Sequence, residues 1–305
     1  MESCRGGIKE AGKGMKTRAV VHGAASIVNA IPTGLGAALG IDLTTIVEAE
    51  LFESNKRELD VEVKVEDEKI EDTVLLEKTV NKLLNIVGEE KAGIYLDIYS
   101  NIPVARGLKS SSAVSDAVVL AVSKLLGIRL NLIEAVNLAV DACIEAGVTI
   151  TGAFDDAVTC MIGGVNITDN YKREILTHWS IEEDLSILIS IPEEKIYTGE
   201  LDVDIFKNIR TLSSRAVTLA LNGLIWDAMI INGFIIASAL NIDYRPMLAV
   251  LKKNILACGV SGKGPAIIAV TTPDYENEIE GEFRNFGKTL KTKPNNKMAE
   301  VEVLK

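Results

Sequence analysis

The stretch "NIPVARGLKSSSAVSDAVVLAV", residues 101–122, runs from a short extended segment through a glycine and three serines into an apolar-periodic run. Apolar residues recur at helical spacing from Ala113 to Leu125, so we expect a helix that ends before Gly127. The first turn of a helix has unpaired N–H groups and the positive end of the macrodipole. Gly107 lets the backbone turn tightly or approach a ligand. One serine suffices to cap a helix, so three of them favour a bound anion over a simple cap.

The overall composition is that of a folded chain with an acidic surface. The 305 residues are 48% hydrophobic and 25% charged, and the formal net charge is −11. Non-specific binding to nucleic acid depends on Lys and Arg neutralising phosphates, so we expect no nucleic-acid partner. A small phosphate ligand is compatible with this charge, because backbone N–H groups can bind it.

The cysteines and histidines exclude several kinds of site. Cys4, Cys143, Cys160 and Cys258 show no metal-type spacing, and the chain has 2 histidines. We interpret the cysteines as reduced thiols of a cytoplasmic protein. Scarce histidine argues against a zinc hydrolase or a Ser-His-Asp triad, and His22 is interpreted as a packed strand residue.

The hydropathy of the chain predicts neither a targeting segment at the N-terminus nor a membrane-spanning segment. Residues 1–14 are rich in glycine and charge and lack an apolar core, so we expect a flexible tail over 1–16. The most apolar segment, 219–240, contains Asp227 and two asparagines. We therefore expect a buried helix there and no membrane span.

Periodicity and punctuation predict an alternation of strands and helices. Strands are expected over 17–31, 41–50 and 93–103, with a turn over 31–40, and residues 59–70 alternate as in a half-exposed antiparallel strand. Helices are expected over 73–87, from the N-cap Asn131 with its capping-box partner Glu134, and over 154–162. Beyond about residue 166 the pattern indicates a second α+β unit.

The common phosphate-binding motifs do not match. The segment Gly7–Gly14 is close to the Walker pattern but ends in glycine where Ser or Thr is needed. It also follows no predicted strand and precedes no predicted helix. No G-x-G-x-x-G follows a predicted strand, so the dinucleotide-binding motif is absent as well.

Three segments together resemble a known family. "P-x-x-x-G-L-x-S-S-S-A" (103–113), "E-A-G-V-T-I-T-G-A-F-D-D-A-V" (145–158) and "G-V-S-G-K-G-P-A-I-I-A-V" (259–270) resemble, in order, the three motifs of the GHMP small-molecule kinases. The segments "RGLKSSSAVSDAV", "TGAFDDA" and "HGAASIVNAIPTG" are most similar to those of the archaeal type of shikimate kinase. Each motif alone is weak, whereas the ordered triple is specific.

The resemblance implies a two-domain α+β GHMP kinase fold with mixed and antiparallel sheets and a left-handed βαβ-type phosphate-loop unit. We expect an N-terminal ATP-binding domain over 17–168 and a C-terminal domain over 169–305. The implied activity is phosphorylation of the 3-hydroxyl of shikimate by ATP with Mg²⁺, a step toward chorismate and aromatic amino acids. The alternatives are a homoserine or mevalonate kinase, or a non-catalytic metabolite sensor. Whether the chain is a monomer or a homodimer stays open.

The resemblance also assigns residues to the nucleotide. Ser111 matches the family serine that contacts Mg²⁺, and Glu145 lies where the family has its metal-binding Glu. Lys109 stands where many relatives have glycine, and its ammonium reaches either a phosphate or solvent. The implied ATP loop consists of Pro103, Val104, Ala105, Arg106, Gly107, Leu108, Lys109, Ser110, Ser111, Ser112 and Ala113.

Asp155 matches the catalytic acid of the family, which orients the acceptor hydroxyl and takes its proton. Asp156 is its rival, and an Asp pair before a short helix also suits capping. Several relatives have an assisting Lys in the first strand and its loop, where this chain has none. Whether Asp155 is a true base or a positioning group therefore stays open.

The acceptor site is the least specified. Gly262 and Gly264 are expected to let the backbone approach the substrate, with a plain turn as the alternative. The carboxylate of shikimate needs a cation, for which Arg is the usual bidentate partner. Arg106, Arg210 and Arg215 are the candidates, with the latter two carried as the substrate-binding prediction.

Overall fold

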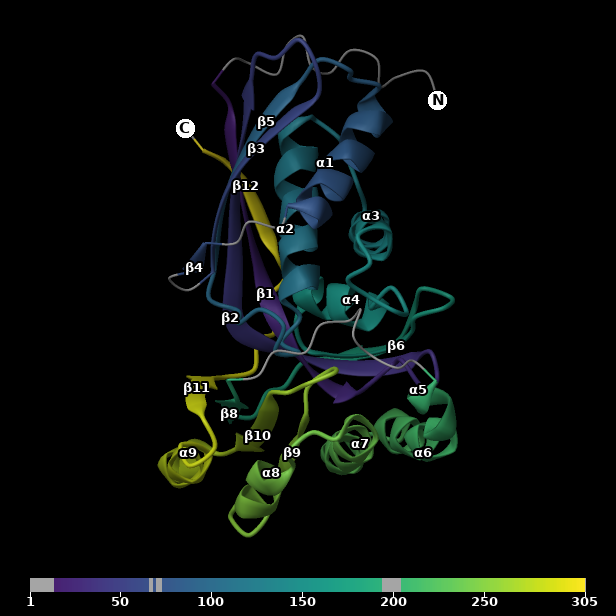
Figure 1. Cartoon of the computed structure of the whole chain (residues 1–305), viewed down its shortest axis with the longest axis vertical. Coiled ribbons are helices and arrows are strands. Elements are labelled where there is room, and N and C mark those ends of the chain that lie inside the picture. Colours follow the sequence, from purple (N-terminus) through teal and green to yellow (C-terminus); the bar gives the residue numbers. More distant parts are fainter. Residues whose placement is uncertain (1–13, 66–67, 70–72, 194–203, 305) are drawn as a thin grey trace.

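The computed structural model describes residues 14–65, 68–69, 73–193 and 204–304, and its larger sheet forms the upper part of the molecule in Figure 1. This sheet has eight strands: β1 (Lys16–Val28), β2 (Leu35–Phe52), β3 (Glu58–Val65), β4 (Glu68–Lys69), β5 (Gly93–Ser100), β6 (Val165–Asp169), β7 (Glu174–Trp179) and β12 (Glu300–Leu304). Their order is β12-β1-β2-β5-β3-β4, with β6 beside β2 and β7 beside β6. The sheet is mixed, because β3 and β5 run parallel while their neighbours run antiparallel.

The expected turn over 31–40 is wrong in extent, because only residues 29–34 separate β1 from β2. The small residues that suggested a turn lie in β2, where the chain packs very closely. A Cβ on Gly36 would lie 2.3 Å from Oδ2 of Asp155, and one on Gly40 would lie 2.6 Å from a carbonyl oxygen of the C-terminal segment. These glycines serve close approach within a strand and bring Asp155 against the sheet.

The alternating segment expected as an antiparallel strand over 59–70 contains β3, which pairs in parallel with β5 along its whole length. Parallel neighbours need a crossover, and α1 (Val74–Val87) supplies it. Alternation of polarity reports which face of a strand is buried and carries no information about strand direction. The resulting unit is β3-α1-β5, which leads directly into residues 101–112, the segment called the serine loop below.

Four helices cover one face of the large sheet (Figure 1): α1, α2 (Ser110–Leu125), α3 (Leu132–Glu145) and α4 (Phe154–Ile162). Their predicted ends are confirmed. Gly88 closes α1 in the left-handed conformation. The capping box at α3 is formed, since Asn131 Oδ1 accepts from Glu134 N at 3.0 Å and Glu134 Oε2 accepts from Asn131 N at 2.8 Å. Local caps and apolar periodicity thus sufficed to locate these helices.

The lower part of the molecule contains an antiparallel sheet in the order β11-β8-β10-β9 with helices around it (Figure 1). Its elements are β8 (Ser186–Ile191), α5 (Ile205–Asn208), α6 (Arg210–Leu221), α7 (Ile225–Leu240), α8 (Arg245–Val250), β9 (Ala257–Val260), β10 (Ile267–Thr271), the 3₁₀ turn η2 (Pro273–Tyr275), α9 (Glu276–Phe283) and β11 (Lys288–Thr292).

The single helix expected over 219–240 is wrong in extent. The chain breaks between α6 and α7, where Gly223 has a φ of 82° that favours glycine. Within the described ranges, none of the helices has both the length and the apolar character needed to cross a bilayer.

The two parts of the chain are interleaved. The boundary expected between residues 168 and 169 falls at the end of β6, and two later strands return to the large sheet, β7 beside β6 and β12 beside β1. The expected tail over 1–16 falls mostly outside the described residues, and β1 begins at Lys16. Elements from both ends of the chain thus hold the sheet on which the serine loop rests.

Candidate active site

The serine loop joins β5 to α2 through three residues with left-handed backbone. Ala105, Gly107 and Lys109 have φ values of 56°, 84° and 67°, and such a conformation is costly for the two that are not glycine. Lys109 occupies the N-cap position, and no side chain caps α2. Capping, the alternative to anion binding, is therefore not what the serines do in this structure. The first N–H groups of a helix have no partner within the helix, and Lys109 and Ser110–Ser112 at this end of α2 line a cavity.

Residues 261–266 between β9 and β10, called the C-terminal glycine-rich loop below, lie directly on the serine loop. A Cβ on Gly107 would lie 2.0 Å from the carbonyl oxygen of Ser261, so only glycine fits there. Ser261 Oγ donates to the carbonyl oxygen of Gly107 at 2.7 Å and accepts from the N–H of Ser26 in β1 at 3.1 Å. Asn29 Nδ2 donates to the carbonyl oxygen of Gly262 at 2.8 Å. Two of the predicted motifs, far apart in the sequence, thus meet through direct hydrogen bonds.

The acidic motif supplies a carboxylate that is held by one amide side chain. Asp155 lies in the first turn of α4 and is 3% exposed. Asn170 Nδ2 donates to Asp155 Oδ1 at 2.7 Å, and Asn170 Oδ1 accepts from the N–H of Asp155 at 3.0 Å and from Thr168 Oγ1 at 2.8 Å. Asn170 therefore fixes both the backbone and the side chain of Asp155.

The electrostatics around Asp155 favour a carboxyl that changes protonation near neutral pH. Burial, and then the charge of Asp156, raise the pKa of Asp155 to about 7 against the opposing effects of Lys109 and Asn170. Asp156 Oδ1 lies 2.9 Å from Lys109 Nζ, and both side chains are nearly buried. Burial lowers the pKa of Lys109, but the carboxylates of Asp156 and Asp155 more than reverse this and raise it.

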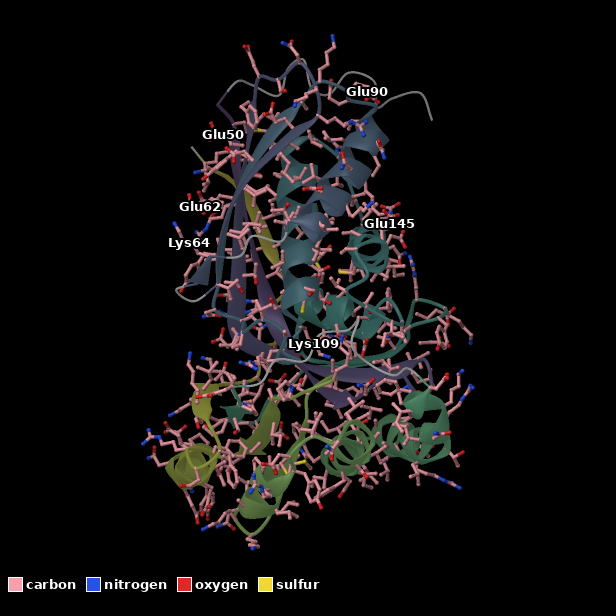
Figure 2. The ribbon with its side chains drawn as sticks, in the orientation of Figure 1. Glu50, Glu62, Lys64, Glu90, Lys109 and Glu145 are labelled. Carbon is pink, nitrogen blue, oxygen red and sulfur yellow. The ribbon has the colours of Figure 1, made fainter. Side chains whose placement is uncertain are left out.

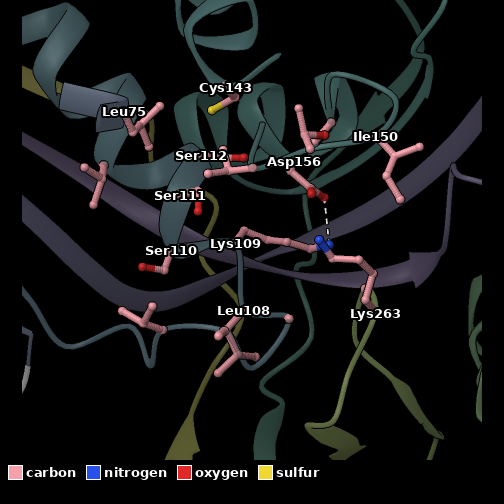
Figure 3. Close-up of a pocket in the computed structure, with 18 of the residues that line it drawn as sticks. Leu75, Leu108, Lys109, Ser110, Ser111, Ser112, Cys143, Ile150, Asp156 and Lys263 are labelled. Carbon is pink, nitrogen blue, oxygen red and sulfur yellow. Dashed lines mark ion pairs between the residues drawn. The ribbon is translucent and has the colours of Figure 1, made fainter. Parts of the chain in front are cut away.

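These three motifs line one cavity of about 500 Å³, a volume suited to a small-molecule ligand. Figure 3 shows Lys109 reaching across it to Asp156, with Lys263 arriving from the opposite side. The predicted residues in its wall are Pro103, Val104, Ala105, Gly107, Leu108, Lys109, Ser110, Ser111, Ser112, Asp155, Gly262 and Gly264.

Other predicted residues are placed elsewhere. Glu145, at the end of α3, pairs with Lys82 Nζ at 2.5 Å and lies away from Lys109 (Figure 2). Arg106 Nη2 donates to the carbonyl oxygen of Glu193 at 2.7 Å. Arg210 and Arg215 are exposed on α6. None of these four, nor Ala113 of the predicted ATP loop, belongs to the cavity wall among the described residues.

His22 and the described cysteines have the structural roles expected for them, as a packed histidine and as buried thiols. Burial lowers the pKa of His22, whose Nδ1 lies 3.7 Å from Asp42 Oδ1, and His22 is not in the wall of the cavity. Cys143 lines the cavity, and burial raises the pKa of its thiol to about 12, so it is no nucleophile at neutral pH. Cys160 and Cys258 are also buried free thiols.

Sequence reasoning missed two polar residues of the site. Asn170 lies just beyond β6, and only the fold brings it to Asp155. Lys263 lies between the glycines of "SGKGP", where a charged residue inside a close-packed loop was a signal that could have been used. The family resemblance placed an assisting lysine in the first strand and its loop. In the structure the ammonium groups near Asp155 come instead from Lys109 before α2 and from Lys263 between β9 and β10.

Comparison with known proteins identifies the class. The family model described as GHMP kinases N terminal domain matches residues 74–164. The homoserine kinase from Cytophaga hutchinsonii superposes with a TM-score of 0.72 at 17% identity, over 93% of this chain and 97% of that one. The fold is thus that of the GHMP kinases.

Curated relatives narrow the family. A shikimate kinase of Methanothermobacter thermautotrophicus is 36% identical over 92% of this chain and 96% of its own length. A shikimate kinase of Thermococcus kodakarensis is 38% identical over 90% of this chain and 98% of its own length. The chain belongs to the archaeal shikimate kinase family of the GHMP kinases.

Proposed function

We propose that this protein transfers the γ-phosphoryl group of ATP to the 3-hydroxyl of shikimate. Two kinds of observation support the proposal. The archaeal relatives that match nearly the whole chain carry the name shikimate kinase. The observation that carries it is structural: the buried carboxylate of Asp155 and the open start of α2 share one cavity.

The cavity has an apolar part and a polar part that suit the two ends of ATP. Val63, Val65, Leu75 and Val104 line the apolar part, which is suited to a purine base. Ser110–Ser112 and the N-terminal N–H groups of α2 line the polar part, where the helix dipole favours negative charge. The triphosphate would therefore lie along the serine loop with its γ-phosphate toward Asp155.

Asp155 would act on the acceptor. Its pKa of about 7 leaves a substantial ionised fraction at neutral pH, matched to accepting the proton of a hydroxyl as the bond to phosphorus forms. Asn170 Nδ2 holds Oδ1 of this carboxylate in place, and Asp155 lies in the wall of the cavity that would receive the hydroxyl. Lys109 supports the ionised form by its charge.

A bound Mg²⁺ would neutralise charge on the β- and γ-phosphates. Mg²⁺ in such sites is held mainly by phosphate oxygens and water with one or two protein oxygens, and the hydroxyl of Ser111 in the cavity wall fits that role. Glu145 does not fit where the structure places it, since its carboxylate is engaged with Lys82 outside the wall. Its proposed role as a ligand would require that ion pair to open.

The competing functions are separated by one assay. ADP release is measured with shikimate, homoserine, mevalonate and no acceptor. We expect turnover with shikimate far above the ATPase background, and no turnover with the other two alcohols. Preferred turnover of another alcohol would assign a different GHMP kinase, and no turnover with any of them would favour the metabolite sensor.

A substitution tests the role of Asp155 separately. Asp155→Ala is expected to lower kcat by at least about 10²-fold while the affinity for ATP changes little, because the lost contact matters chiefly in the transition state. Asp156→Ala is the matched control for the rival carboxylate. Near wild-type turnover by Asp155→Ala would refute the assignment.

The proposed location is the cytoplasm, supported by the buried reduced cysteines. The small-molecule partners are ATP and shikimate, and the acidic net charge argues against nucleic acid.

A further inference from the structure

Lys263 lies at the tip of the C-terminal glycine-rich loop, at the contact between the two parts of the molecule. Its neighbour Gly262 touches the serine loop, since a Cβ on Gly262 would lie 3.0 Å from Lys109 Nζ and 3.4 Å from the carbonyl oxygen of Gly107. Figure 3 shows the side chains of Lys109 and Lys263 converging beside Asp156. The backbone that carries Lys263 is held by the Asn29 hydrogen bond to Gly262.

The cavity wall has few cationic side chains for a ligand as anionic as a triphosphate. Among the described residues of the wall, Lys109 and Lys263 are the two that carry positive charge. They come from opposite loops, Lys109 from the start of α2 and Lys263 from the turn between β9 and β10. A group held between these ammoniums would therefore contact both parts of the fold.

The charges around Lys263 are consistent with a site for an anion. Burial, and then the like charge of Lys109, lower the pKa of Lys263 to about 8, while the carboxylate of Asp156 acts in the opposite direction. Two ammonium groups in close proximity repel each other, and an anion bound between them removes that repulsion. Asp156 pairs with Lys109, and its charge also acts on Lys263, so an anion bound between the two ammonium groups would add to this stabilisation.

We propose that Lys263 is a catalytic residue that, with Lys109, binds the γ-phosphoryl group while it passes from ATP to the acceptor. This inference deepens the proposed function and depends on it. The acceptor oxygen forms a bond to the γ-phosphorus, the bond from that phosphorus to the β–γ bridging oxygen breaks, and ADP leaves with the electron pair. The hydroxyl proton goes to Asp155, and Lys263 keeps its own proton throughout.

The acceptor carboxylate is the other anion that a lysine here could bind. The position of Lys263 favours the phosphoryl group, because its loop lies on Gly107 of the serine loop and its ammonium is close to the Lys109–Asp156 pair beside Asp155. Charge builds up on the equatorial oxygens of the phosphoryl group during transfer, and fixed cations at that point stabilise the transition state.

Steady-state kinetics of substituted enzymes test the proposal. Lys263→Met is expected to lower kcat about 10²- to 10³-fold and to raise the KM for ATP about tenfold, with the KM for shikimate changed less than about threefold. Lys263→Arg, which keeps the charge, should recover at least about tenfold of that loss. The matched control is Lys252→Met, on an exposed lysine of the same part of the chain, and it should behave as wild type. An unchanged kcat would overturn the proposal, as would a selective rise in the KM for shikimate.

Nucleotide binding tests the same contact without any acceptor, so it distinguishes failure of this inference from failure of the proposed function. The non-hydrolysable analogue AMP-PNP and ADP are titrated calorimetrically with wild type, Lys263→Met and Lys252→Met. In the wild type we expect a lower Kd for AMP-PNP than for ADP. In Lys263→Met the ratio of the Kd for ADP to the Kd for AMP-PNP should fall by at least about tenfold. Lys263→Gln replaces Lys263→Met if the latter fails to fold. A preference that survives the removal of Lys263 would overturn the inference even if shikimate is turned over.

Discussion

At the scale of single residues, the candidate site contains one carboxyl group and one ammonium group whose pKa values are moved toward neutrality. Burial does most of this for both Asp155 and Lys263. Asp155 is ionised only as the pH rises through about 7, whereas Lys263 is charged only below about 8. The two groups thus have their active protonation states together in a narrow interval.

The pH profile of kcat/KM for ATP should therefore be bell-shaped, because it reports the free enzyme. It rises as Asp155 loses its proton near pH 7 and falls as Lys263 loses its proton near pH 8. The charged and polar groups that face Asp155 and Lys263 are Asp156, Lys109 and Asn170. They are present both in the wild type and in Lys263→Arg, so they do not account for a difference between the two profiles. In Lys263→Arg the alkaline limb should disappear and the acid limb should stay, because Arg keeps its charge across this range. An alkaline limb that persists would show that another group titrates there.

Asp116 is a second buried carboxyl, in α2 behind the serines. Both of its oxygens are buried without a hydrogen-bond partner among the described residues, and burial followed by the charge of Asp156 raises its pKa well above the usual value. The unfolded chain releases this proton at the ordinary pKa, so Asp116 destabilises the fold increasingly as the pH rises above about 4.

Asp116→Asn should consequently unfold at a higher temperature than wild type at pH 7. Each unit of pKa elevation corresponds to about 1.4 kcal/mol in the free energy of unfolding once the pH exceeds the native pKa. Thermal unfolding at pH 4 and pH 7 measures the effect, and the gain should shrink at pH 4. Asp60→Asn, on an exposed strand residue, is the control. A lower melting temperature at pH 7 would mean that the carboxyl has a partner in the native protein.

At the scale of elements, close packing of β2 against α4 positions the carboxylate of Asp155, for which we propose the catalytic role. Gly36 leaves space for Asp155 Oδ2, which would lie 2.3 Å from an added Cβ. The glycines of β2 therefore contribute to the site although none of them lines the cavity.

Gly36→Ala should displace Asp155 and lower kcat by about 10²-fold, because a shift of about 1 Å in a reacting group has an effect of that size. The KM for ATP should change little, since the serine loop is untouched. Gly281→Ala is the matched control: it lies in α9 with nothing within 4 Å of the added Cβ, and it should stabilise the fold by about 0.5–1 kcal/mol. Wild-type kcat in Gly36→Ala would show that the strand yields instead of the carboxylate.

At the scale of the whole molecule, one hydroxyl joins three segments that are remote in sequence. Ser261 Oγ bonds to Ser26 in β1 and to Gly107 in the serine loop. These contacts hold the C-terminal loop, and with it Lys263, over the start of α2.

Ser261→Ala should lower the free energy of unfolding by about 1–3 kcal/mol, because it leaves a buried N–H and a part-buried carbonyl without their partner. It should also raise the KM for ATP, since the serine loop loses its support. Ser214→Ala is the control, because its hydroxyl bonds within an exposed turn of α6. Chemical denaturation and steady-state kinetics give the two readouts. Unchanged stability would mean that the loop is held without Ser261.

The sequence by itself determined the class of fold, the ends of α1, α3 and α4, and the three segments that meet at the cavity. Helical periodicity, caps and glycine stops act within a few residues, so they can be read locally. The order of the motifs carried the family resemblance for the same reason.

Only the tertiary structure decided which charged groups face each other. It paired Lys109 with Asp156, placed Asn170 against Asp155 and brought Lys263 into the cavity, while it left Glu145 with Lys82 and the arginines outside. It also made β3 parallel to β5 and returned β12 to the first sheet. Partners of this kind are chosen by contacts between segments remote in the chain and by the cost of burying a charge unpaired. Neither effect is expressed in local sequence.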